Sequence, residues 1–299
     1  FAFILENTSL HRFVPVKKKL KIKREIKISN EVRLRKTLER LGPTFIKFGQ
    51  LLSIRPDFVP KEYIHELEKL QDNVPAFSYE EVKETIEKSI GNKITEIFEK
   101  FEKKPVASAS IAQVHEAVLK TGERIAVKVR RPGIRGIVEK DVEIMMFIAK
   151  LLEKHVKGLR KYRPTIIVSE FAEWTKKEID FNIETENIKR FYENFKGSKT
   201  TVIPKVYGQY CNESVIVMEF IDGTELHKIG KNKKKILGKA VKNGFYSILE
   251  QVFIHGLFHA DPHPSNIIIL KNSKVGFVDF GIVGNFDNNL KNKAIDLFI

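Results

Sequence analysis

Two short apolar stretches near the end of the chain constrain its fold more than any other feature. Residues 266–270 and 275–278 are mostly apolar, and the polar residues 271–274 separate them. Strands joined by so short a polar turn form an antiparallel hairpin. The start of the first strand and the end of the second then lie at the same open end. The pattern therefore predicts that the side chains of Asn266 and Asp279 converge there.

A third oxygen-bearing side chain belongs to the same region. Asp261 lies five residues before Asn266, in a loop that Pro262 and Pro264 stiffen. Mg²⁺ takes one or two carboxylates and completes its shell with phosphate oxygens and water, so this group suits it. Asp and Asn at turns commonly bond their own backbone, which is the competing interpretation for each residue alone. Three such residues at this spacing favour a magnesium site.

A lysine in an apolar strand indicates a second binding element. Lys128 lies within residues 124–130 among apolar neighbours, where a buried ammonium needs an acidic or phosphate partner. The alternative is an exposed lysine on an edge strand. Ahead of it, residues 107–112 are nearly all small. Such residues let backbone N–H groups approach a phosphate, although they also pack turns.

Composition narrows the class of protein. The chain has 299 residues, enough for one large domain or two lobes, and 42% of them are apolar, as in globular proteins. Its single cysteine, Cys211, excludes an internal disulfide and a cysteine-built zinc site, and fits a reducing compartment. No apolar run approaches the ~18–20 residues of a membrane-spanning helix. Since the first residue is Phe1 rather than Met, we expect a piece of a longer protein.

The positive charge is concentrated rather than spread. The formal net charge is +15, and residues 17–36 hold ten Lys or Arg against two acids. A second run, residues 228–242, holds seven lysines. Such runs either form a solvated face or attract phosphate on nucleic acid or anionic lipid. Because residues 17–36 contain no aromatic side chain to stack on bases, lipid headgroups are favoured and no nucleic-acid partner is expected.

The spacing of apolar residues predicts helices first, then a mixed sheet region, then a helix and the hairpin. Helical spacing covers residues 30–72, 78–100 with a break at Gly91, 133–156, 165–196 and 234–257. Strand patterns cover residues 112–115, 124–130, 202–210 and 214–221.

Taken in order, these features match the protein-kinase signature set: a small-residue loop, a strand lysine, a buried strand, a catalytic loop and a final Asp-Phe-Gly. Four details resemble the UbiB-like atypical kinase family, the AarF group. Residues 47–50 are similar to its K-x-G-Q motif and residues 178–180 to its E-x-D motif. The loop is alanine-rich rather than glycine-rich, and residues 259–264 read His-Ala-Asp-Pro-His-Pro in place of the usual His-Arg-Asp.

The resemblance implies an α+β, bilobal protein-kinase-like fold with an N-terminal helical extension and a truncated helical C-terminal lobe. It implies that Lys128 holds the phosphates of ATP and pairs with Glu184. It also implies that Asp261 is the base-like residue and that Asn266 and Asp279 hold Mg²⁺. Spacing from Lys128 alone favours Glu143, fifteen residues further on, whereas the family pattern places an insert here and favours Glu184.

Further residues receive roles from the same resemblance. The phosphate loop would comprise Ala107, Ser108, Ala109, Ser110 and Ile111. The adenine-reading hinge would comprise Met218, Glu219 and Ile221. Four motif residues are expected to meet where a helix covers the cleft and restricts its opening: Lys47, Gln50, Glu178 and Asp180.

The resemblance also implies an organisation and a function. The expected parts are a basic segment 1–36, a helical extension 37–104, a sheet lobe 105–221 with an insert at about 133–176, and a partial lobe 222–299. We expect an ATPase rather than a protein kinase acting in trans. It would support ubiquinone-type biosynthesis at an anionic membrane surface, with quinone-pathway lipids or enzymes as partners. The location would be cytoplasmic and peripheral to the membrane.

Three alternatives stay open at this point. A nucleotide-binding scaffold of slow or absent turnover uses the same residues, and an ordinary protein kinase shares most of them. A metal hydrolase is the third, because histidines crowd near Asp261. That reading is weakened because Gly256 stands where a zincin helix needs Glu. The histidines concerned are His255, His259 and His263.

Overall fold

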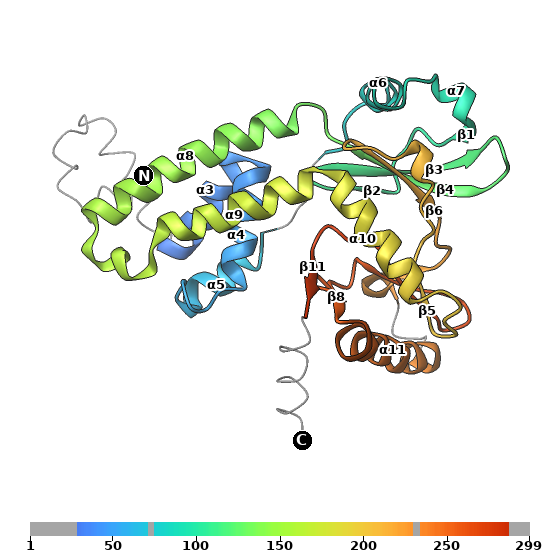
Figure 1. Ribbon diagram of the computed structural model, residues 1–299. Helices are drawn as coiled ribbons and strands as arrows, with labels where there is room; N and C mark the ends of the chain where they lie inside the picture. The colour runs from blue at the N-terminus through green and yellow to red at the C-terminus, as the bar shows by residue number, and fades with distance from the viewer. Residues whose placement is uncertain (1–28, 71–74, 230–233, 287–299) are drawn as a thin grey trace. The chain divides into compact units, whose positions relative to one another are not determined.

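The protein was analysed as a computed structural model, which describes residues 29–70, 75–229 and 234–286. The chain divides into two compact units (Figure 1). The first comprises Phe1–Pro75 and Gly133–Thr175, and the second Ala76–Pro132 and Lys176–Ile299. The segment inserted after the lysine strand therefore groups with the N-terminal helices. This division differs from the four consecutive parts expected from the sequence.

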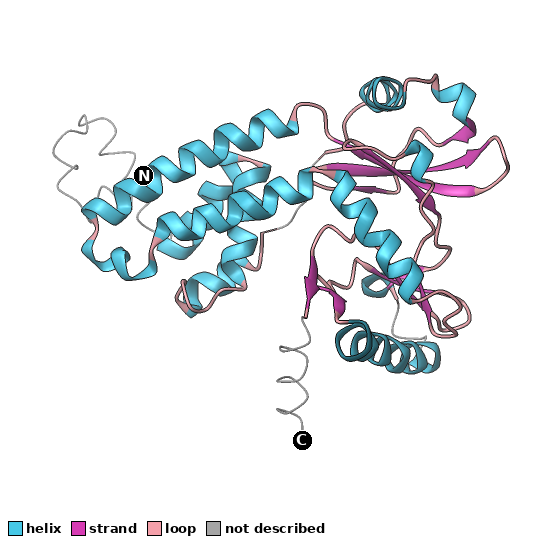
Figure 2. Cartoon of the chain, in the orientation of Figure 1, coloured by secondary structure: helices cyan, strands magenta, loops and turns pink. Residues whose placement is uncertain are grey.

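The first unit is helical in its described residues (Figure 2). It contains α3 (Asn30–Leu41), α4 (Pro43–Ser53), α5 (Lys61–Leu67), α8 (Ile134–His155) and most of α9 (Pro164–Ile179). Pro43 begins a new helix at its first turn, where its missing N–H costs nothing. The core of the unit joins all five helices through Leu38, Phe45, Leu51, Leu67, Leu70, Met145, Ala149, Val168 and Phe171.

One glycine lets the N-terminal helices approach closely. A Cβ added to Gly49 would lie 2.3 Å from Leu70 Cδ1 and 2.8 Å from Leu38 Cδ1, both of them buried side chains. A methyl group at this position therefore requires the surrounding leucines to move. The glycine of the K-x-G-Q-like motif thus has a packing role of its own.

The second unit is built on an antiparallel sheet. Its strands are β1 (Phe98–Phe101), β2 (Ala107–Ser108), β3 (Ala112–Leu119), β4 (Arg124–Arg130) and β6 (Val215–Glu219). The order is β1-β3-β4-β6, and β2 pairs with Gln113 and Val114 near the start of β3. Strand β4 is therefore central and cannot be an exposed edge.

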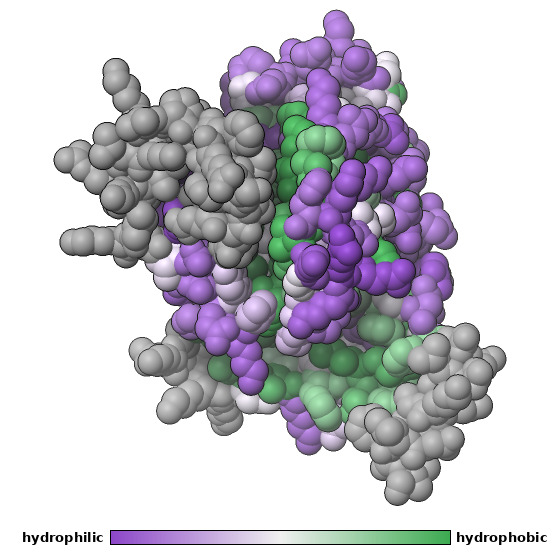
Figure 3. Space-filling model, turned by 90° about the vertical axis from the view of Figure 1, so that its left-hand side faces the viewer, coloured by the Kyte–Doolittle hydropathy of each residue, from purple (hydrophilic) through white to green (hydrophobic). Residues whose placement is uncertain are grey.

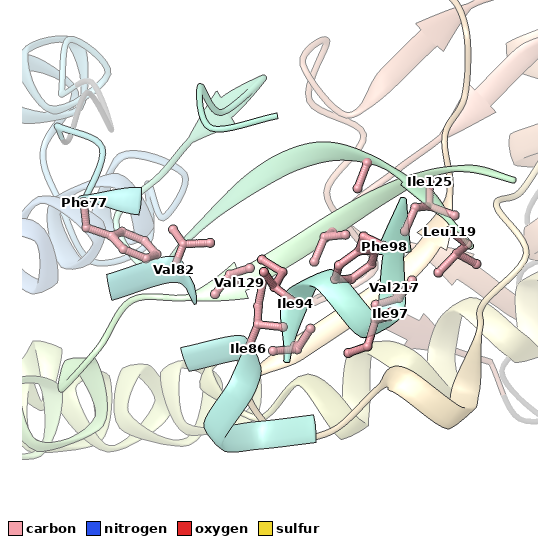
Figure 4. Close-up of a cluster of buried hydrophobic side chains, with 13 residues drawn as sticks. Phe77, Val82, Ile86, Ile94, Ile97, Phe98, Leu119, Ile125, Val129 and Val217 are labelled. Atoms are coloured by element: carbon pink, nitrogen blue, oxygen red, sulfur yellow. The ribbon is translucent and has the colours of Figure 1, made fainter. Parts of the chain in front are cut away.

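Short helices cover one face of this sheet, as Figure 4 shows. These are α6 (Tyr79–Ile90) and α7 (Ile94–Ile97), and Gly91 ends α6 in the left-handed conformation, which accounts for the predicted break. Their apolar side chains meet alternate residues of the strands. The cluster comprises Phe77, Val82, Ile86, Ile94, Ile97, Phe98, Ala117, Leu119, Ile125, Val127, Val129, Val215 and Val217.

The helical pattern at 165–196 is divided in two. Helix α9 ends at Ile179, and α10 (Phe181–Asn194) begins after Asp180, whose carboxylate accepts a hydrogen bond from the Asn182 N–H at 3.0 Å. This N-cap satisfies one of the free N–H groups at the start of α10 and fixes the change of direction.

The strand predicted over residues 202–210 is mostly wrong. Only β5 (Thr201–Val202) forms there, and residues 208–210 form a 3₁₀ turn. Pro204 has no N–H to donate to a ladder, which ends the strand. The rest of the segment follows the edge of β6 through single bonds, from the N–H of Tyr207 to the Val217 carbonyl and from that of Glu219 to the Lys205 carbonyl.

The C-terminal part of the unit carries the predicted hairpin. Strands β9 (Ile267–Ile269) and β10 (Val275–Phe277) pair antiparallel with Phe277 opposite Ile267, and β5 and β7 (Thr224–Glu225) flank them. Helix α11 (Lys234–Leu249) precedes it and continues as a π-helical segment, Glu250–His255. Strands β8 (Leu257–His259) and β11 (Val283–Asn285) form a separate pair.

The packing of Gly49 leads to a stability prediction. We expect Gly49→Ala to destabilise the protein by about 1 kcal/mol, because overpacking costs ~1–3 kcal/mol and better helix propensity returns up to about 1 kcal/mol. Gly136→Ala is the matched control in α8, where nothing lies within 4 Å of the added Cβ. It should stabilise by about 0.5–1 kcal/mol. Urea denaturation measures both, and equal shifts for the two variants would contradict the packing role.

Candidate functional site

The alternation of strand β4 determines where its lysine points. Successive side chains of a strand face opposite sides, so Val127 and Val129 enter the core under α6 while Lys128 faces α10. There the Lys128 Nζ donates to both carboxylate oxygens of Glu184, at 2.7 and 2.8 Å. Only 2% of the Glu184 side chain is exposed. The other candidate partner, Glu143, is exposed on α8 of the first unit.

The hairpin brings a second carboxylate to the same ammonium. The Asp279 Oδ1 lies 3.2 Å from the Lys128 Nζ, and half of the Asp279 side chain is exposed. Its backbone has a φ of +64°, an uncommon conformation for a residue with a Cβ but one that Asp adopts more readily than most. A hydrogen bond from the Gly281 N–H to Oδ1, 3.4 Å, supports this turn.

Burial and charge act in opposite directions on this group. Burial alone would lower the pKa of Lys128, but the carboxylates of Asp279 and Glu184 outweigh it and raise the pKa above its usual range. Burial raises the pKa of Glu184, and the nearby charge of Asp279 adds to this, while Lys128 opposes it. Their balance raises the pKa of Glu184 to about 7, and Lys128 is the charge that opposes a further rise.

Aromatic packing fixes the segment that follows Asp279. Phe280 is fully buried, with its ring 4.8 Å from that of Phe191 and 5.1 Å from that of His259. The buried amide of Asn187 donates to the Phe280 carbonyl at 2.9 Å. Because Asn187 lies three residues beyond Glu184 on α10, one helix face holds both the lysine partner and the Asp-Phe-Gly segment.

The predicted catalytic loop is tied to the hairpin. His259 is buried, its Nε2 donates to the Val278 carbonyl at 3.1 Å, and its Nδ1 accepts from the Asp261 N–H at 3.3 Å. The Asn266 amide donates to the Asp261 carboxylate at 3.1 Å, and the Val278 N–H donates to the Asn266 carbonyl at 3.0 Å. Asp261 and Asn266 are thus in direct contact, and Asp279 begins where the hairpin opens.

The donor set at this end of the hairpin fits Mg²⁺. The Asn266 amide nitrogen donates to Asp261, its Oδ1 accepts from the Ser265 hydroxyl at 3.4 Å, and the half-exposed Asp279 supplies a carboxylate. One carboxylate and one amide oxygen supply only two ligands, so phosphate oxygens and water would complete the six-ligand shell of Mg²⁺. Among the described residues, no group of three or more His, Cys, Asp or Glu is arranged around a metal.

The histidines of the metal-hydrolase alternative make separate contacts. His255 packs its ring 5.2 Å from that of Phe195, and His263 bonds the Ser265 hydroxyl at 2.7 Å. His259 is occupied on both nitrogens by backbone groups. Their contacts give no support to a shared zinc site.

The expected phosphate loop and hinge lie on the sheet of the same unit. Ala107 and Ser108 form β2, Ala109 is exposed, and Ser110 and Ile111 are buried. At the hinge, Met218 and Ile221 are buried, and the Glu219 N–H is used by the Lys205 carbonyl.

The motif residues are divided between the units. Glu178 approaches the Asp-Phe-Gly turn, since a Cβ at Gly281 would lie 3.6 Å from its Cγ, and Asp180 caps α10. Lys47 and Gln50 lie on α4 of the first unit, where the Gln50 amide donates to the Leu70 carbonyl at 3.2 Å. Their expected approach to the E-x-D-like residues stays a prediction.

Sequence reasoning missed the polar residues that support the site. Asn187 could have been found, because a buried amide at i+3 from Glu184 shares its helix face. Gln113 and His115 are buried polar residues of β3, and Arg131 follows β4. The alternation of β3 directs Gln113 and His115 toward the interior. No local sequence pattern indicated their hydrogen-bond partners.

A model of the ABC1 atypical kinase-like domain matches residues 69–299. The chain belongs to this family. It is 40% identical over 262 residues to a probable protein kinase UbiB of Marinobacter nauticus, covering 84% of the chain and 47% of the relative. It is 37% identical over 272 residues to the chloroplastic protein ACTIVITY OF BC1 COMPLEX KINASE 7 of Arabidopsis thaliana, covering 89% of the chain and 38% of the relative.

The ABC1-family chain spans less than half the length of these curated relatives. Among solved structures, it is similar to Rv3197 of Mycobacterium tuberculosis, described in complex with erythromycin. The TM-score is 0.56 at 26% identity, covering 94% of this chain and 73% of that one. The predicted α+β kinase-like fold and the predicted family are confirmed by these matches.

The buried ion pair of this ABC1-family protein leads to a pH prediction. We expect Lys128→Met to destabilise by about 3 kcal/mol at neutral pH, because it leaves the Glu184 charge buried beside Asp279. The folded pKa of Glu184 then lies above its unfolded value, so the folded state binds more protons and stability falls as pH rises. The loss should be smaller at about pH 5.5 than at about pH 8.

Urea denaturation at the two pH values measures this effect. Lys128→Met combined with Glu184→Gln is the control, because it removes the buried charge together with its partner, and it should recover much of the loss. A pH-independent loss in the single variant, or no recovery in the double variant, would show that the pair does not determine stability here.

Proposed function

We propose that this protein binds ATP together with Mg²⁺ and hydrolyses or transfers its terminal phosphate, acting as an atypical kinase-like ATPase. The observation that carries the proposal is the three-residue group of Lys128, Glu184 and Asp279. A single ammonium is held between a buried carboxylate and a half-exposed one at the open end of the hairpin. Family membership and the names of the kinase relatives support the same class of activity.

Each residue has a task that follows from its surroundings. Glu184 holds the Lys128 ammonium in place and charged, so that it can meet phosphate oxygens. Asp279 and Asn266 would hold Mg²⁺, which neutralises charge on the phosphates when bound. In the structure the Asp279 carboxylate also contacts the Lys128 ammonium. The binding of Mg²⁺ would give this carboxylate a partner other than Lys128.

Asp261 is proposed as the residue that orients the attacking hydroxyl or water. It is exposed, and its carboxylate is positioned by the Asn266 amide and its backbone by His259. Ala260 stands where conventional kinases have an arginine, so control by a phosphorylated activation loop is not expected. The adenine would contact the hinge, Met218 to Ile221.

A thermal-shift and turnover series tests this function. Wild-type protein should gain stability with ADP or ATP plus Mg²⁺, by about 2.7 kcal/mol at a hundredfold excess over Kd. Lys128→Ala should lose most of this gain, and Asp279→Asn should lose its dependence on Mg²⁺. Lys120→Ala, an exposed lysine at the end of β3, is the matched control.

Single-turnover hydrolysis of ATP completes the test. Turnover that disappears in Asp279→Asn supports the ATPase. Nucleotide binding with no turnover would favour the scaffold alternative, and no nucleotide-dependent stabilisation of the wild type would refute both.

We further propose that the protein acts at an anionic membrane surface in support of quinone biosynthesis, as the resemblance to UbiB-like proteins implies. Most of the basic segment 17–36 lies outside the described residues. Within the described residues, no helix is long and apolar enough to cross a membrane. Helix α8 has features that suit attachment to a membrane surface.

Helix α8 is apolar on two sides. One side packs into the core of the first unit through Met145 and Ala149. The other side is exposed, and Figure 3 shows apolar residues at the surface among hydrophilic ones at this end of the molecule. A helix with a second, exposed apolar side has a surface that another partner can cover. The exposed residues are Ile137, Ile144, Phe147, Ile148 and Leu151.

The same helix leads into a basic segment. Residues 154–163 contain five Lys or Arg and no acid, so an apolar strip and a positive end adjoin. Such a pattern is typical of helices that lie on anionic bilayers. It complements the predicted lipid contact of residues 17–36.

Vesicle co-sedimentation tests the membrane proposal. Binding should require anionic lipid, weaken with salt, and fall at least severalfold in Lys157→Glu/Lys161→Glu and in Phe147→Ser. Lys83→Glu/Lys88→Glu on α6 of the other unit is the matched control. Binding that ignores lipid charge and salt would refute the proposal.

A further inference from the structure

Three bonds join one arginine to the alanine-rich loop. Arg131 directly follows β4, and its backbone N–H donates to the Ile111 carbonyl at 2.7 Å. Its guanidinium donates from Nε to the Ser110 carbonyl at 3.1 Å and from Nη2 to the Ala109 carbonyl at 3.3 Å. Three consecutive loop carbonyls are therefore turned toward one residue.

Because the peptide bond is planar, the direction of each loop carbonyl also determines the direction of the N–H group that follows it. In a trans peptide the carbonyl of one residue and the N–H of the next point in opposite directions, and the described residues contain no cis peptide. Fixing the carbonyls of Ala109 and Ser110 toward Arg131 thus directs the N–H groups of Ser110 and Ile111 away from it. The Ala109 N–H closes the loop on the Ala112 carbonyl at 2.8 Å.

The guanidinium itself rests on a buried support. Its central carbon lies 5.1 Å from the centre of the Phe77 ring. The Phe77 backbone is held by both ends of the Gln113 amide, which accepts from its N–H at 3.1 Å and donates to its carbonyl at 3.3 Å. Gln113 is only 1% exposed and also bonds His115 at 3.0 Å.

The support extends to the edge of the sheet. The His115 Nδ1 donates to the Glu102 carbonyl at 2.8 Å, so its Nε2 accepts from the Gln113 amide. Burial lowers the pKa of His115, which keeps it in the neutral form that this arrangement requires. The position of Arg131 is thus determined by a chain of buried polar contacts behind the loop.

We propose that Arg131 is a positioning residue that orients the N–H groups of the alanine-rich loop toward the phosphates of the bound nucleotide. Glycine-rich loops adopt such orientations through their freedom at positive φ, which alanine lacks. Here a side chain outside the loop imposes the orientation instead. The proposal rests on the proposed nucleotide function of the site.

The test uses two substitutions and a control in the full chain. Arg131→Gln removes both the charge and the planar guanidinium. Arg131→Lys keeps the charge, but an ammonium cannot hold two carbonyls at fixed angles. Arg135→Gln, on α8, removes a more exposed arginine that lies 3.9 Å from Glu139. Calorimetry compares ADP with adenosine, which has no phosphate.

We expect ADP to bind at least tenfold more weakly to both Arg131 variants and adenosine to bind as it does to the wild type. Arg135→Gln should change neither affinity. An unchanged ADP affinity, or equal losses for ADP and adenosine, would overturn the positioning role. Rescue by Arg131→Lys would also overturn it, because charge alone would then suffice.

Hydrogen exchange on the nucleotide-free protein separates this proposal from the proposed function. Backbone amides of residues 107–113 should exchange at least severalfold faster in Arg131→Gln than in the wild type and in Arg135→Gln. If the wild type binds no nucleotide, the proposed function fails and the role toward phosphates fails with it. Unchanged exchange would show that Arg131 does not hold the loop at all.

Discussion

A buried carboxylate facing a single ammonium determines how the second unit is organised. Glu184 is almost completely removed from water, and an ionised carboxylate in such a place is stable only beside a positive charge. Strand β4 must therefore present Lys128 toward α10, and α10 must approach the sheet on the face opposite α6 and α7. The alternation of β4 satisfies the apolar core and the ion pair together, since Val127 and Val129 fill one side while Lys128 serves the other.

The same helix then connects the sheet to the hairpin. Glu184 contacts the strand lysine, and Asn187, one turn later, holds the Phe280 carbonyl. Asp279 stands between these two contacts and meets the ammonium from the hairpin side. Because α10 contacts both the sheet and the Asp-Phe-Gly segment, a displacement of this helix would break the ion pair and release that segment together. The spacing of three residues on a helix is what makes this coupling possible.

The sequence was sufficient for the local geometry and insufficient for the distant partners. Apolar strands around a polar turn predicted the hairpin, and its register places Asn266 and Asp279 at the expected end. Spacing alone favoured Glu143, which is not the partner of Lys128, because the chain leaves the sheet for the first unit before it returns with Glu184. The strand expected over residues 202–210 ends before Pro204, because proline has no backbone N–H to donate to the sheet. This loss outweighs the β propensity of the neighbouring residues. The packing role of Gly49 depends on leucines from two other helices, which no local pattern reveals.

The absence of glycine in the proposed phosphate loop accounts for the polar groups that are buried behind it. A glycine-rich loop carries its own conformational freedom and needs little from its surroundings. An alanine-rich loop must be held from outside, and the holding residue must itself be held. Arg131 bonds the loop, Phe77 lies under its guanidinium, and Gln113 and His115 fix Phe77 from within the sheet. Each of these buried polar groups would cost stability without its partner, and each has one. On the proposal made here, the polar interior of β3 is the structural consequence of building a phosphate loop from alanine and serine.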